Sequence, residues 1–293
     1  KCDETFSYAD RFDEKYDMVR TLRQGKWKYI RNYQGFSPDG LQNNYRYRML
    51  AYKEWPKLWK DGELNEVQQQ FFFPRPAEQL FDLSKDPHKV KDLSIDPAFH
   101  KKLMEMRIKL SKKVKEINDL SFYPESFMVD KALLNPIAFG KKRSSEIAKL
   151  VDIADLALLP FQEVDNHLKE ILSSGTDWQK YWACLVVAQY GPQAKSLESL
   201  LPELMEDSNL MVQLRAVEAW ALVSQNNPIP KLIEITNVSK SRIEVLLTLN
   251  SIAFFRDHQG YDLDASLFSI VSLKGEFYRI FEYFADSNGV PKK

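Results

Sequence analysis

Charged and apolar residues alternate near the start of the chain, and this pattern predicts a β-hairpin. Residues 17–23 read as one strand, and residues 26–31 alternate strictly after a Gln-Gly turn. Two such runs around a tight turn are typical of a hairpin. A third strand is expected over residues 78–83, after a loop marked by two prolines. The first part of the chain is therefore expected to contain a small antiparallel sheet.

A helical pattern follows the third strand. Asp96 is suited to cap a helix N-terminus, and Pro97 to occupy its first turn. Apolar residues then recur at spacings of three and four: Phe99, Leu103, Met106, Leu110, Val114 and Ile117. This spacing places them on one face of an amphipathic helix, which we expect to pack on the sheet.

The second half of the chain reads as helix throughout. Residues 181–183 resemble residues 214–216 at an offset of 33, with alanines at equivalent positions that suit close helix crossings. We therefore predict three parts. Residues 1–125 form an α+β domain with a small antiparallel sheet and a packing helix, 126–145 form a linker, and 146–293 form an all-α, HEAT-like repeat domain closed by a final helix near Phe277–Phe284.

Composition narrows the function classes. The 293 residues include 41 basic and 41 acidic side chains, so net charge indicates no particular partner. No apolar run reaches the roughly 18 residues of a membrane span, and no nucleic-acid-binding motif occurs. Two cysteines are too few for a disulfide framework or a zinc site. Because the chain opens without methionine or a signal-peptide core, we expect a processed or truncated start.

One segment has the composition of a ligand-binding surface. Residues 20–60 hold ten Lys or Arg, two acids and nine aromatic side chains. Basic groups bind sulfate, phosphate or carboxylate, and aromatic rings suit sugars or nucleobases, so an anionic glycan or a nucleic acid would fit. Strand alternation alone also produces lysines beside aromatics. The irregular, polar part at residues 34–48 favours the ligand.

Three stretches carry motifs of a known family. Residues 10–32 hold an acidic turn, then M-V-R-T-L-R and K-Y-I-R-N, and residues 64–78 hold L-N-E-V-Q, F-F and P-R-P-A-E. Residues 78–93 hold E-Q-L-F-D-L and D-P, where Lys89 and Asp92 replace the Glu and Asn usual in the family. Together these stretches resemble the C-terminal region of type I sulfatases, most closely heparan N-sulfatases and their bacterial homologues.

The resemblance covers roughly residues 8–123. It implies hydrolysis of sulfate esters or sulfamates by a formylglycine made from Cys or Ser in a Cys/Ser-x-Pro-x-Arg sequence, with a calcium ion held by Asp and Asn. Neither Cys2 nor Cys184 stands in that sequence, and no Asp-Asp pair suits the metal. We therefore expect formylglycine and calcium in a missing N-terminal catalytic domain, and no sulfate hydrolysis by this chain alone.

The resemblance also implies a role for the acidic turn. Asp10, Arg11, Asp13 and Glu14 would sit in a loop that faces the sugar and would bind the substrate, with the alternative that this charged loop only caps the hairpin. Arg20 is expected to pack or pair with an acid. The implied partners are the catalytic domain and a sulfated glycan, and the implied location is periplasmic or secreted.

Two other functions stay open. The chain would otherwise be a stand-alone module that binds anionic glycans, or a helical-repeat scaffold for protein interactions. A large exposed apolar face on the sheet would favour the sulfatase portion, because the catalytic domain would cover it.

Overall fold

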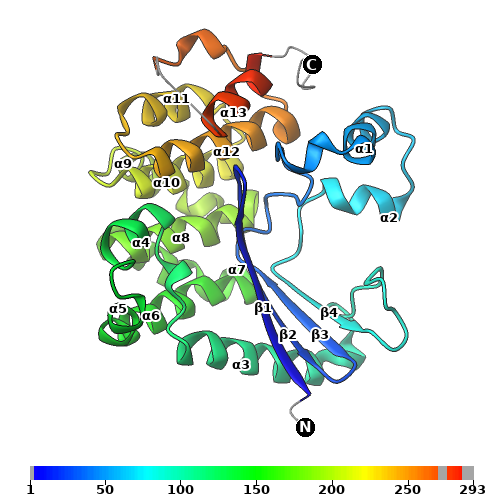
Figure 1. The fold of residues 1–293 in the computed structure, drawn as a ribbon. Helices are drawn as coiled ribbons and strands as arrows, with labels where there is room; N and C mark the ends of the chain where they lie inside the picture. The colour runs from blue at the N-terminus through cyan, green and yellow to red at the C-terminus, as the bar shows by residue number, and fades with distance from the viewer. Residues whose placement is uncertain (1–2, 270–275, 286–293) are drawn as a thin grey trace.

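The chain begins with a four-stranded antiparallel sheet. The computed structural model describes residues 3–269 and 276–285, so Cys2 lies outside the described residues. The strands lie in the order β1-β2-β3-β4 (Figure 1). Their bounds are Glu4–Phe12 for β1, Lys15–Gln24 for β2, Trp27–Asn32 for β3 and Glu78–Asp82 for β4. The hairpin and the third predicted strand are confirmed, and β1 adds an edge strand before them.

One face of the sheet is covered by the predicted amphipathic helix. This helix, α3 (His100–Glu116), follows a short 3-10 turn that Asp96 caps through a bond from the Ala98 backbone N–H. It contacts β2 and β3. The buried apolar residues from the two elements are Met18, Leu22, Tyr29 and Leu80 of the sheet and Leu103, Met106, Leu110 and Val114 of the helix. The predicted packing of this helix is therefore confirmed.

The turn after β4 is held by the side chain of Asp92, the residue that replaces the asparagine usual in the family. The Asp92 carboxylate accepts hydrogen bonds from the backbone N–H groups of Leu80 at 3.0 Å and Ser94 at 2.9 Å. An aspartate thus holds the segment that returns from the edge of the sheet toward α3.

Helices make up most of the rest of the chain, and in Figure 1 most of them lie on one side of the sheet, whereas α1 and α2 lie on the other. The helix bounds are α1 Leu50–Lys60, α2 Glu66–Gln69, α4 Glu125–Lys131, α5 Pro136–Lys142, α6 Ser144–Asp155, α7 Phe161–Ser174, α8 Asp177–Tyr190, α9 Leu201–Leu204, α10 Leu210–Ser224, α11 Ile229–Val238, α12 Arg242–Gln259 and α13 Glu276–Ala285.

The predicted repeat copies lie in α8 and α10, which pack directly on each other. Their alanines, Ala183 and Ala216, are fully buried, as close helix crossings require. Range 126–145, expected as a linker, contains most of α4 and all of α5. The division into two domains and the HEAT-type assignment of the helices stay predictions.

Buried aromatic side chains join the sheet to the helices. Trp182 of α8 lies edge-on to Tyr33, which follows β3, with ring centroids 5.7 Å apart. Its indole N–H donates to the Phe122 carbonyl oxygen at 2.8 Å. On α12, the Asn250 side-chain oxygen accepts from the Tyr16 backbone N–H at 3.3 Å. Sheet and helices therefore share one continuous hydrophobic core.

Candidate functional site

Two of the four predicted site residues lie at the end of strand β1, not in a loop as expected. Asp10 pairs with Arg20 of β2 at 2.9 Å and accepts from the Ser121 hydroxyl at 3.1 Å. Arg11 contacts Glu125 at the start of α4 at 3.0 Å. Asp10 keeps 26% of its side chain exposed and Arg11 keeps 34%, so both remain partly accessible.

The other two form the turn between β1 and β2. Asp13 adopts a left-handed backbone conformation with φ 55°, and its carboxylate accepts from the Tyr45 backbone N–H at 3.1 Å. Glu14 is buried and accepts from the Asn44 backbone N–H. Burial and the adjacent Asp13 carboxylate raise the pKa of Glu14 to about 8. The turn is thus bound to residues 44–45, and the substrate-binding role of all four residues stays a prediction.

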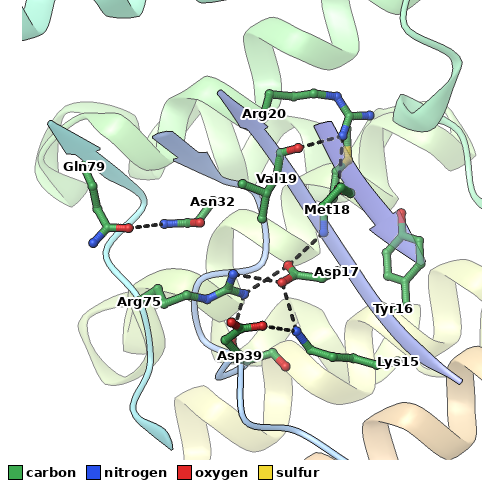
Figure 2. A network of polar contacts seen from close by, with 12 residues as sticks. Lys15, Tyr16, Asp17, Met18, Val19, Arg20, Asn32, Asp39, Arg75 and Gln79 are labelled. Atoms are coloured by element: carbon green, nitrogen blue, oxygen red, sulfur yellow. Dashed lines mark hydrogen bonds and ion pairs between the residues drawn. The ribbon is translucent and has the colours of Figure 1, made fainter. Parts of the chain in front are cut away.

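A network of charged side chains lies behind this turn, at the end of the sheet (Figure 2). Lys15 contacts Asp17 at 3.3 Å and Asp39 at 2.9 Å, and Arg75 contacts Asp17 at 2.8 Å. Burial alone would raise the pKa of Asp17, but the charges of Arg75 and Lys15 lower it. Both acids are therefore ionised at neutral pH, and the network fixes the path of residues 37–39 against β2.

Two arginines of the family motifs are buried in ion pairs. Arg20 binds both carboxylate oxygens of Asp119, at 2.6 Å and 3.1 Å. Arg31 contacts Asp155 at 3.2 Å and donates to the Ala154 carbonyl oxygen at 2.6 Å. Arg20 therefore has the ion-pair role expected of it, and Arg31 ties β3 to α6.

The aromatic side chains of the basic segment, residues 20–60, lie partly in the core and partly at the surface. Tyr29, Tyr33 and Tyr47 are buried, so core packing accounts for them. Trp59 instead lines a cavity of about 170 Å³ where α1 meets α12 and α13. Sequence patterns indicated that basic and aromatic residues gather here, but not that α12 completes the cavity.

The described residues do not fit the metal and nucleophile of a sulfatase. Within residues 3–269 and 276–285, no group of three His, Cys, Asp or Glu side chains is placed to hold a metal ion. Cys184 is buried in α8, and burial raises the pKa of its thiol. Across the same residues, no helix has the length and apolar character needed to cross a bilayer.

Comparison with known proteins adds a partial relationship. No protein-family model matches the chain. An ulvan-active sulfatase from Formosa agariphila is 39% identical over 124 residues, which are 42% of this chain and 21% of that protein. The match thus spans about a fifth of the length of this curated relative. A 124-residue region of the chain is therefore related to a sulfatase.

Proposed function

We propose that the chain is the C-terminal portion of a sulfatase that hydrolyses sulfate esters or sulfamates on a sulfated glycan. The identity of 39% over 124 residues with an ulvan-active sulfatase carries this proposal. The family motifs at residues 10–32 and 78–93 support it, since they fall on the hairpin and on the β4 turn.

The chemistry is assigned to a catalytic domain outside this chain. Formylglycine and calcium would belong to that domain, because the described residues offer neither a metal-ligand cluster nor an accessible cysteine. The apolar side chains on β1 support an attached domain, since Tyr8 is 72% and Phe12 51% exposed. The family resemblance further suggests a periplasmic or secreted protein.

In this proposal the chain supplies one wall of the substrate cleft. Asp10, Arg11 and Asp13 keep part of their side chains exposed and would contact sugar hydroxyl or amino groups. Glu14 is buried, so its proposed role is to hold the turn that carries them. The ionic network of Lys15, Asp17 and Arg75 would keep that turn rigid behind the cleft.

The test is sulfate release from a sulfated polysaccharide by the full natural protein. We expect activity, and we expect Arg11→Ala to raise KM more than it lowers kcat, because the residue binds substrate without joining the chemistry. Lys112→Ala, on the exposed side of α3, is the control. A natural protein that releases no sulfate from any sulfated glycan would overturn the proposal.

A non-catalytic module for anionic glycans is the second candidate. The cavity lined by Trp59 and three lysines favours it. Under this alternative, the natural protein would bind sulfated oligosaccharides and leave their sulfate content unchanged.

A further inference from the structure

The cavity between α1 and the C-terminal helices has an aromatic wall. Trp59 stacks on Phe72, with ring centroids 4.8 Å apart and an interplanar angle of 7°, and on His258 at 5.4 Å and 28°. Tyr47 and Tyr283 add two more rings to the lining. At about 170 Å³, the cavity is smaller than the roughly 300–1,000 Å³ typical for drug-sized ligands, so it suits one small unit.

Three lysines of α1 line the same cavity. Lys53, Lys57 and Lys60 are spaced by four and three residues, which places them on one face of the helix. All three are exposed, and none makes an ion pair with another residue of the described chain. Like charges at this spacing repel each other, so a bound anion would stabilise the helix.

The acids and the histidine at the cavity do not cancel this charge. Asp257 is already paired with Arg256 at 2.7 Å and accepts from the Tyr283 hydroxyl. Burial lowers the pKa of His258 to about 4, so its ring is neutral at pH 7. Asp61 is the remaining acid in the lining, against the three lysines. The cavity is therefore apolar on one side and cationic at its rim.

We propose that this cavity binds one anionic sugar unit, with the half-buried ring of Trp59 against the C–H surface of the sugar. Lys53 and Lys57 receive the sulfate or carboxylate of that unit. The inference deepens the proposed function, because it assigns a second contact of the chain with a sulfated glycan. Aromatic rings and cations in one small cavity match a ligand that is itself part apolar and part charged.

The experiment is titration of the full natural protein, followed by Trp fluorescence, with glucose 6-sulfate, glucuronate, glucose and inorganic sulfate. We expect saturable binding of one or both anionic sugars, no binding of glucose, and much weaker binding of inorganic sulfate. Glucose 6-sulfate and glucuronate together distinguish sulfate from carboxylate recognition.

The matched variants are Lys53→Gln/Lys57→Gln in the cavity and Lys101→Gln/Lys112→Gln on the exposed face of α3, which change the charge equally. The first should weaken Kd about tenfold, or ~1.4 kcal/mol, and the second should leave it unchanged. Circular dichroism checks that both fold, and Lys57→Gln alone serves if the double variant does not.

Three outcomes would overturn the inference: equal loss in both double variants, inorganic sulfate binding as tightly as the sugars, or no sugar binding. Sulfate release from a polysaccharide is measured separately on the same protein. An active enzyme without this sugar site would therefore refute the inference alone, and an inactive protein that binds the sugars would refute the sulfatase proposal alone.

Discussion

Replacing Arg20 with methionine would leave two acids facing each other in the interior. Arg20 is 1% exposed and lies between Asp119, at 2.6 Å and 3.1 Å, and Asp10, at 2.9 Å. Methionine keeps much of the aliphatic volume but leaves both carboxylates without their cation. Removing one partner of a buried ion pair costs about 3–5 kcal/mol. Because water reaches part of Asp10, we expect a loss near ~3 kcal/mol.

The assay is urea unfolding at pH 7, followed by circular dichroism, with Arg23→Met as the control. Arg23 lies on the same strand but is exposed, and among the described residues its guanidinium donates only to the Gly25 carbonyl oxygen. Its replacement should change stability by less than ~0.5 kcal/mol. Equal free energies of unfolding for the two variants would refute the assignment of Arg20 as a structural ion-pair centre.

The pH dependence gives a second check on the same variant. Burial already raises the pKa of Asp10, and loss of Arg20 would raise it further. The folded variant then binds protons more tightly than the unfolded chain, so its deficit against the wild type should shrink as pH falls from 7 toward 4.5. A deficit that is constant over this range would contradict the reasoning.

Three further predictions follow from buried groups. Glu14→Gln should gain stability relative to the wild type progressively from about pH 4.5 to 8, because the folded wild type, with the pKa of Glu14 raised to about 8, keeps a proton that the unfolded chain releases. A difference in urea midpoint between variant and wild type that is the same at pH 5 and pH 8 would contradict this. As pH falls from 6.5 to 4, His258→Phe should lose less stability than the wild type, because the pKa of His258 is lowered to about 4 and only the unfolded wild-type chain protonates this histidine in that range. Melting temperatures of the variant and the wild type that fall in parallel with pH would refute this. Trp182→Ala should cost about 3–5 kcal/mol in urea unfolding, since it opens a cavity and orphans the Phe122 carbonyl oxygen, and a loss under ~1 kcal/mol would show that the sheet and helices do not depend on this contact.

Local periodicity was enough to predict the hairpin and the helix that packs on the sheet. The alternation in residues 17–31 and the apolar spacing in residues 99–117 directly reflect which face is buried, so β2, β3 and α3 follow from them. Pro136 and Gly140 suggested a linker over residues 126–145, yet Pro136 begins α5 with the Asn135 side chain as its cap. Proline is favoured in a first helical turn, so the same residue marks a helix start as well as a loop.

The candidate sites depend on contacts that local patterns do not encode. Lys15 reaches Asp39 and Arg75 reaches Asp17 across separations of 24 and 58 residues. Glu14 is buried and accepts a hydrogen bond from the Asn44 backbone, 30 residues along the chain, and no feature of the acidic turn itself indicates this contact. Likewise, the basic and aromatic composition of residues 20–60 was visible in the sequence, but the stacking of Trp59 on His258 of α12 was not.

The most direct test of the central proposal is the intact mass and peptide map of the natural protein from its source. We predict a species much heavier than 34.2 kDa, with a Cys/Ser-x-Pro-x-Arg peptide upstream whose Cys or Ser has become formylglycine. A mature protein of about 34 kDa that begins near Lys1 would contradict the sulfatase proposal and leave the chain as a glycan-binding module or scaffold.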